Sequence, residues 1–413
     1  MFKEKNAIDK VIWIITVFLI ASFLLFDSYA WGKISFFVCA AVIAVLSAFE
    51  NRGKIRIGIG AFFGHYFAFA VFTVLSALWS LDTANTLIMA RTLFRTIVCF
   101  LPIYWHYRKE EKSEQLITAV VFASYFVAIY SLLFYGFDNI VMAAAGRRLD
   151  NEYANVNAIA IFLAIGCFCD WYLTLFKRKR ITSLCSLLSL VLIAAFQSRK
   201  AIVVILFGFA ALLYFKLVIS EKRRTVKRVV GVIVVVAILY GVLSIISELS
   251  LASGALTRMT ELFNLFIGEG KVDNSTLVRQ QMLHVGWETW KEHPLFGVGI
   301  AGVHIVASAQ MSRDSYLHNN YVEILSGGGI VGFLLFYSTY FMIWRKIKKI
   351  KQRDYPRYVF CTLFVVILLI LDWGRVSYYS KTFIFQFMML YILACGGEQR
   401  GAVKENVTIV QSR

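Results

Sequence analysis

Long apolar runs recur along the chain and are separated by short polar segments. Most approach the ~20 residues that a helix needs to cross the hydrocarbon core of a bilayer. This pattern predicts twelve membrane-spanning helices, at residues 11–26, 34–49, 57–79, 86–105, 115–136, 154–176, 181–196, 200–219, 229–248, 322–344, 358–373 and 381–396. We therefore expect an all-α polytopic membrane protein.

One long polar stretch, residues 247–320, interrupts this pattern between the ninth and tenth predicted spans. Residues 255–266 within it place apolar side chains at helical spacing, which predicts an amphipathic helix on the membrane surface. Those apolar residues are Leu256, Met259, Phe263 and Phe266. The predicted division of the chain is thus helices one to nine in 1–248, a loop in 249–320, helices ten to twelve in 321–396, and a tail in 397–413.

A second helix is predicted in the same stretch. Asn274 or Ser275 can cap its start, and it runs to about His293. Pro294 and Gly297 then end it. One face of this helix is predicted to carry Val278, Met282, Val285 and Thr289.

Composition supports a membrane protein and the distribution of charge gives its orientation. The chain is 59% hydrophobic and only 16% charged, whereas soluble domains have roughly 25% charged residues. One set of alternate loops holds more than twice as many Lys and Arg as the other. By the positive-inside rule the first set is cytoplasmic, with both termini, and the large loop lies outside the membrane. The net charge of +18 therefore indicates membrane topology, and we expect no nucleic-acid partner.

Five arginines are predicted near the outer half of the membrane. Arg91 and Arg95 lie four residues apart in the fourth span, Arg147 and Arg148 precede the sixth, and Arg199 begins the eighth. A guanidinium makes bidentate, charge-assisted hydrogen bonds to phosphate, so this grouping favours an anionic substrate. The alternative is that each arginine reaches lipid headgroups or pairs with an acidic residue.

His318 is the candidate general base, because it lies where the large loop re-enters the membrane and imidazole is matched to proton transfer near neutral pH. The neighbouring Asn319 and Asn320 are candidates to orient its ring. The alternative is a structural histidine. No His-x-x-x-His or acidic pair accompanies the loop histidines, so we expect no metal site.

Three consecutive glycines, residues 327–329, interrupt the tenth predicted span. Glycine has low helix propensity, so the triplet favours a kink or a close approach of another backbone. Tight packing of helices through small residues is the equally acceptable alternative.

The loop motif resembles the O-antigen ligase and O-antigen polymerase superfamily of bacterial envelope glycosyltransferases. The resemblance rests on Arg279, Trp287, the His-Pro-Leu-Phe-Gly-Val-Gly run at 293–299, and the pair His318 and Asn319. Weaker matches are residues 75–82, the Asn-Val-Asn segment at 155–157, where valine replaces the usual proline, and the Ser-Arg-Lys-Ala segment at 198–201, where lysine replaces glycine.

The resemblance implies a metal-independent glycosyltransferase without a cofactor, in a bacterial inner membrane. Its donor would be a glycan on undecaprenyl diphosphate in the outer leaflet. Arg199 and Arg279 would hold the diphosphate, and His318 would activate the acceptor hydroxyl. We assign substrate binding to Asn157, Trp287 and Asn319 and, as an addition of our own, to Arg91, Arg95, Arg147 and Arg148.

Three functions are compatible with these residues. The leading hypothesis is a polymerase that joins lipid-linked repeat units into a capsular, exopolysaccharide or O-antigen chain. The second is a ligase that moves a finished glycan to an acceptor such as lipid A-core. The third is a flippase or other transporter, which would place ionisable groups near the bilayer midplane and often shows repeat symmetry. The expected partners are the donor, the acceptor, lipids and other polysaccharide-assembly proteins.

Overall fold

A computed structural model describes residues 7–27, 29–50, 58–147, 149, 154–178, 183–219, 274–311 and 316–395. These residues form helices joined by short loops, and no strand occurs among them. The contacts divide the chain into two compact units. Unit 1 is Met1–Cys39 with Gln115–Val272, and unit 2 is Ala40–Glu114 with Asp273–Arg413.

Apolar helices of membrane-spanning length account for most of the described chain, which makes this a multi-pass, all-α membrane protein. Eight described helices are long and apolar enough to cross a bilayer, and three more apolar helices are shorter: Ala61–Ser76, Cys185–Ala195 and Lys381–Cys395. Each predicted span except the ninth coincides with one of these helices. The ninth span, 229–248, and the predicted surface helix at 255–266 lie outside the described residues, so the predicted number of twelve spans stays a prediction.

Unit 1 is built around the buried helix α8. The unit contains α1 (Ala7–Leu25), the first part of α2 (Ala30–Glu50), α6 (Gln115–Tyr135), α7 (Phe137–Ala144), α8 (Val156–Lys177), α9 (Ser183–Ala195), α10 (Arg199–Tyr214) and η1 (Phe215–Ile219). Helix α8 packs on α6, α9 and α10. At the α6–α8 contact, a Cβ on Gly166 would lie 2.1 Å from Ser124 Oγ, so the two helices meet through small residues.

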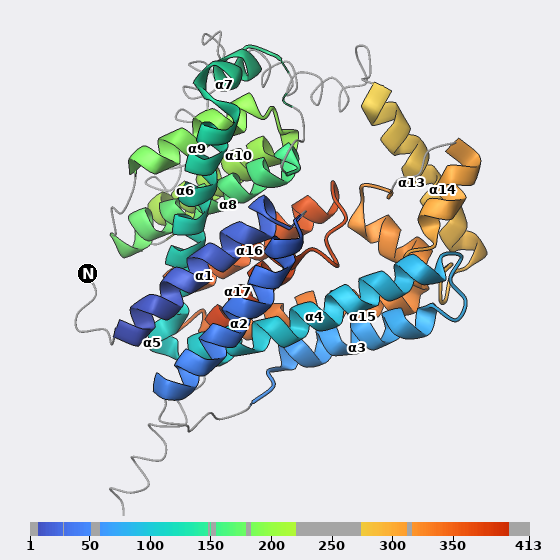
Figure 1. Cartoon of the computed structure of the whole chain (residues 1–413), viewed down its shortest axis with the longest axis horizontal. Coiled ribbons are helices and arrows are strands. Elements are labelled where there is room, and N and C mark those ends of the chain that lie inside the picture. The colour runs from blue at the N-terminus through green and yellow to red at the C-terminus, as the bar shows by residue number, and fades with distance from the viewer. Residues whose placement is uncertain are drawn as a thin grey trace, which may run out of the picture. The chain divides into compact units, whose positions relative to one another are not determined.

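Unit 2 is organised by the long helix α15 (Asn320–Ile350). The unit also contains the end of α2, α3 (Ala61–Ser76), α4 (Thr83–Tyr107), α5 (Glu110–Ser113), α13 (Asn274–Glu292), α14 (Val303–Met311), α16 (Tyr355–Asp372) and α17 (Lys381–Cys395). Helix α15 packs on α3, α13, α16 and α17, and Figure 1 shows α13 and α14 beside one end of α3, α4 and α15.

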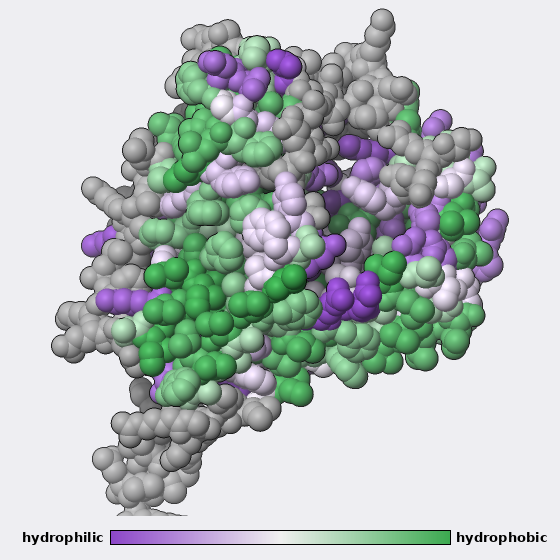
Figure 2. All heavy atoms as spheres, viewed as in Figure 1, coloured by the Kyte–Doolittle hydropathy of each residue, from purple (hydrophilic) through white to green (hydrophobic). Residues whose placement is uncertain are grey.

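The surface of unit 2 changes from apolar to polar along these helices. In Figure 2, apolar side chains cover α3 and α4, and hydrophilic side chains gather over α13 and α14. The exposed apolar residues on α3 and α4 include Phe67, Val74, Leu87, Ile88 and Val98. Such a surface is stable against lipid and is unfavourable in water. Helices α13 and α14 therefore form the polar end of unit 2.

Candidate functional site

Helix α13 carries Arg279 and is fixed by its apolar face. Met282, Val285 and Thr289 on that face are buried, as the sequence predicted. Met282 packs with Val298 and Leu317 in one small core, and Val278 packs against it. This core joins α13 to the loops on either side of α14. It therefore fixes the distance between Arg279 and the segment that carries His318.

The His-Pro-Leu-Phe-Gly-Val-Gly run, residues 293–299, is hydrogen-bonded along α15, with its first four side chains exposed and its last three residues buried. The backbone N–H of Val298 donates to the carbonyl of Ser326 at 3.0 Å. The backbone N–H of Ile330 donates to the carbonyl of Pro294 at 2.9 Å. On its other side, the N–H of Leu81 donates to the Val298 carbonyl at 3.0 Å. The run is thus held between α15 and the turn that joins α3 to α4.

The glycine triplet makes this approach possible. Gly329 has φ +61° and ψ −166°, so the helix is interrupted there and the N–H of Ile330 is free to bond to the loop. A Cβ at Gly329 would lie 2.2 Å from the carbonyl carbon of Leu295. Gly329 therefore breaks the helix and lets the Leu295 backbone approach closely, as the first of the two explanations drawn from the sequence predicted.

His318 adopts an uncommon backbone conformation directly before α15. Its φ is +58°, in the left-handed region that non-glycine residues seldom occupy, although histidine does so more often than most. Its ring packs on the Tyr316 ring, with the centroids 4.3 Å apart and the planes inclined at 54°. The side chain is half-buried. A partly exposed imidazole fixed in a strained turn is a recognised feature of functional sites.

Arg279 interacts electrostatically with the same residue, Tyr316. Burial raises the pKa of Tyr316, and the positive charge of Arg279 opposes that rise, while the negative charge of Glu323 adds to it. Arg279 is partly exposed on α13. The structure therefore brings Arg279 and His318, which are 39 positions apart in the sequence, to one side chain, Tyr316.

The segment that contains His318 is held by capping interactions at the start of α15. Asn319 Oδ1 accepts hydrogen bonds from the backbone N–H groups of Tyr321 at 2.9 Å and Val322 at 3.1 Å. The Glu323 carboxylate accepts the N–H of Leu317 at 2.8 Å. Asn319 was predicted to bind substrate and to orient the His318 ring. The structure gives its oxygen a capping role, and Asn319 Nδ2 is buried without a hydrogen-bond partner among the described residues.

Asn320 also has a different role from the one predicted. Its Oδ1 accepts the backbone N–H groups of Ser377 at 2.8 Å and Tyr378 at 3.2 Å. Its Nδ2 donates to the Tyr337 hydroxyl at 3.2 Å. Asn320 therefore ties the loop between α16 and α17 to the start of α15. This loop was not predicted to belong to the site.

The remaining predicted residues of unit 2 are exposed. Trp287 is 42% exposed on α13 and packs against Trp290, with centroids 4.7 Å apart. Arg91 and Arg95 lie on an exposed face of α4. Arg95 acts electrostatically on Cys99, as does Lys381 at the start of α17. Their assignment to substrate binding stays a prediction.

Unit 1 holds the other predicted residues. Asn155 Oδ1 caps α8 through the N–H groups of Asn157 and Ala158, at 3.0 and 3.3 Å. Val156 thus occupies the first helical position, where proline is favoured but not required. Arg199 begins α10.

Arg147 and Arg199 are connected through Gln197. Gln197 Nε2 donates to the carbonyls of Ala143 at 2.8 Å and Arg147 at 3.5 Å. Because Gln197 lies two positions before Arg199, it brings the segments of the two arginines together within unit 1. Arg148 lies outside the described residues.

One long-range pair was missed by the sequence interpretation. His304 Nε2 and Asp82 Oδ2 are 2.8 Å apart and join α14 to the start of α4. Asp82 also caps α4, accepting the backbone N–H of Asn85 at 2.9 Å. This cap and the contact with His304 lower the pKa of Asp82. The available signal was the resemblance of residues 75–82, which ends on this aspartate.

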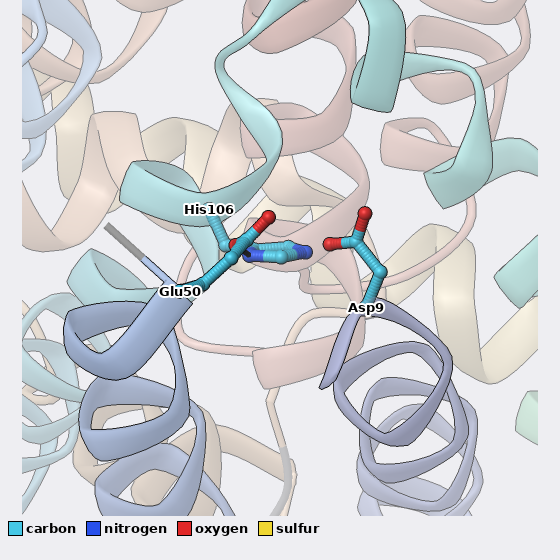
Figure 3. Close-up of side chains that lie close together, drawn as sticks. All are labelled: Asp9, Glu50 and His106. Atoms are coloured by element: carbon cyan, nitrogen blue, oxygen red, sulfur yellow. Dashed lines mark ion pairs between the residues drawn. The ribbon is translucent and has the colours of Figure 1, made fainter. Parts of the chain in front are cut away.

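A separate ionisable cluster lies at the end of α2. His106 Nδ1 and Glu50 Oε2 are 3.3 Å apart, and Figure 3 shows the two side chains facing each other. The Lys112 ammonium pairs with the other oxygen of Glu50. Asp9, drawn in the same view, belongs to unit 1. The charge of Glu50 is thus neutralised by Lys112. The contacts of Glu50 with His106 and Lys112 fix α2 to α4 and α5.

Comparison with known proteins gives one family match. The family model described as O-antigen ligase matches residues 184–337, which include Arg199, Arg279, Trp287, His318 and Asn319. A search of curated proteins finds no match. The matched segment contains the loop motif, and the described helices are those of a multi-pass membrane protein. Residues 184–337 therefore match an O-antigen ligase domain, within a multi-pass membrane protein.

Proposed function

We propose that the chain polymerises lipid-linked oligosaccharide repeat units at the outer leaflet of a bacterial inner membrane. The match of residues 184–337 to the O-antigen ligase family model supports glycan transfer from a lipid-linked donor to an acceptor. The observation that carries the residue assignment is the placement of Arg279 and His318 at one tyrosine, Tyr316. One residue supplies a fixed positive charge and the other a group that accepts a proton, which are the two requirements of this reaction.

The proposed reaction is a displacement at the anomeric carbon of the donor sugar. The acceptor hydroxyl gives its proton to the His318 imidazole as its oxygen bonds to that carbon. The bond from the anomeric carbon to the diphosphate oxygen breaks, and undecaprenyl diphosphate leaves with the electron pair. Arg279 stabilises the negative charge that develops on the diphosphate, and His318 then returns the proton to solvent. Arg199 stays a candidate for diphosphate binding on the family resemblance alone.

The surface of unit 2 supports a site near the membrane boundary. Trp79 Nε1 donates to the Phe296 carbonyl at 3.3 Å, and both rings are exposed. Leu78 and Leu295 beside them are exposed as well. Aromatic side chains with one polar contact are typical of the bilayer interface. We propose that this rim lies at the outer headgroup level and that residues 249–320 form the extracytoplasmic loop over it.

A ligase is the second candidate, because the matching family model is described as O-antigen ligase. The discriminating experiment incubates purified protein with undecaprenyl-diphosphate-linked repeat units and no other acceptor. A polymerase produces a ladder of products that differ by one repeat unit. Transfer that occurs only after lipid A-core is added, with no ladder in its absence, would favour the ligase.

A further inference from the structure

The loop between α16 and α17, residues 373–380, lies beside the His318 segment of unit 2. Besides its two bonds to Asn320, the loop is fixed by the Tyr378 hydroxyl, which contacts the Ile300 carbonyl at 3.3 Å. Burial raises the pKa of the Tyr379 phenol to about 12, and the charges of Glu323 and Tyr316 contribute to the rise. The loop therefore packs against the same residues that hold His318 in place.

This loop carries a guanidinium that lacks hydrogen-bond partners. Arg375 Nε and Nη2 are buried, and neither has a partner among the residues that the structure describes. The guanidinium carbon lies 5.5 Å from the centroid of the Phe383 ring. An aromatic face stabilises the charge in part, but it accepts none of the N–H bonds.

Asp372 is the acidic residue that interacts electrostatically with Arg375, and the two do not pair directly. Its two oxygens accept hydrogen bonds from three hydroxyls instead: Tyr340 at 2.7 Å, Tyr337 at 3.3 Å, and Ser377. No contact of 4.0 Å or less joins Asp372 to Arg375 within the described chain, although the two charges interact electrostatically. The guanidinium N–H groups of Arg375 are therefore available to another hydrogen-bond acceptor.

A buried guanidinium without acceptors is costly, because it has lost its hydration and has gained no hydrogen bonds in return. Arginine cannot avoid the cost by deprotonating, since its pKa stays far above neutral. Arg375 is also part of an ordered loop next to a half-exposed catalytic candidate. This combination indicates a group prepared for a ligand with two acceptor oxygens.

We propose that Arg375 binds a pair of anionic oxygens of the substrate, on the side of the site formed by the α16–α17 loop. The inference rests on the proposed function, in which the donor carries a diphosphate. The planar fork of arginine matches such a pair in bidentate geometry. The carboxylate of an acidic sugar presents the same pair, so the test must separate the two sources.

The test compares Arg375→Lys with the unaltered chain in lipid nanodiscs. Lysine keeps the positive charge beside Asp372 and removes the fork. Arg345→Lys is the matched control, because Arg345 also lies over a ring, Phe341, at 5.9 Å, but near the opposite end of α15. The probes are undecaprenyl diphosphate, as the diphosphate source, and trigalacturonate, as the carboxylate source. Dissociation constants and the Tm are measured for each variant.

We expect Arg375→Lys to bind undecaprenyl diphosphate about tenfold more weakly, with the Tm and the control unchanged. A similar loss confined to trigalacturonate would assign the carboxylate as the ligand. Unchanged affinity for both probes in Arg375→Lys and in Arg375→Met, with a lowered Tm in the methionine variant, would overturn the proposal and leave a structural role. If the unaltered chain binds neither probe, the proposed donor class is wrong and the inference fails with it.

Discussion

The ring of His318 packs on the ring of Tyr316 with their centroids 4.3 Å apart, and this contact fixes the candidate base at the start of α15. The backbone of His318 is left-handed at this point, with φ +58°. Of the two residues chosen from the sequence, His318 packs on Tyr316 and Arg279 interacts with Tyr316 electrostatically.

The contact predicts a role for the ring of Tyr316 that does not depend on its hydroxyl. Tyr316→Ala removes a ring–ring interaction worth about 0.5–1.5 kcal/mol, so we expect the turnover number to fall by up to about tenfold. Tyr316→Phe keeps the ring and is expected to retain most activity. Initial rates of glycan transfer in proteoliposomes measure both. Equal rates for the alanine variant and the unaltered chain would remove Tyr316 from the site.

Arg279→Lys tests whether a bidentate contact is needed. Lysine retains the charge of arginine but not its fork, so we expect kcat/KM for the lipid-linked donor to fall at least tenfold. Lys291→Arg on the same helix is the control, since Lys291 is exposed and pairs with Glu288 at 2.9 Å. Full activity of Arg279→Lys would show that a point charge is sufficient.

The break in α15 predicts that substitution of Gly329 lowers stability unusually strongly. Gly329→Ala places a Cβ 2.2 Å from the Leu295 carbonyl carbon at a positive φ, and we expect a loss of about 1–3 kcal/mol from backbone strain alone. The measurement is thermal unfolding in detergent. Gly64→Ala is the control: its Cβ meets nothing within 4 Å, and alanine favours a helix, so its Tm should be unchanged or higher.

Asp82 predicts a specific dependence of stability on pH. Its pKa is lower in the folded protein than the ~3.9 of an unfolded chain, so its carboxylate stabilises the fold above pH ~4. That contribution is lost as the pH falls below this value through the folded pKa. Asp82→Asn keeps the helix cap and removes the charge. We expect the Tm gap between the two proteins at pH 7 to close below pH 4; a gap that stays constant would exclude a charge effect.

Local patterns were sufficient to predict α13. Its start at Asn274 and its buried face of Met282, Val285 and Thr289 depend on residues within one helix. The start of α10 at Arg199 was predicted for the same reason, because polar residues 197–200 separate two apolar runs.

The packing partners could not be predicted in this way. The role of Gly329 depends on Leu295, and that of Asp82 depends on His304, which is 222 positions away in the chain. Asn319 and Asn320 were placed beside His318 by sequence adjacency. Asn319 caps the helix start, which leaves N–H groups that need acceptors. Asn320 accepts two N–H groups of the α16–α17 loop. Tyr316 and Arg375 have no distinguishing sequence pattern, and only the fold brings them to the site.

The most direct test of the central claim is the rate of glycan transfer by purified His318→Ala with undecaprenyl-diphosphate-linked repeat units. If His318 takes the proton of the acceptor hydroxyl, the rate falls by about 100-fold or more at pH 7, while donor binding and the Tm stay near those of the unaltered chain. Transfer at an undiminished rate by a stably folded His318→Ala protein would contradict the account.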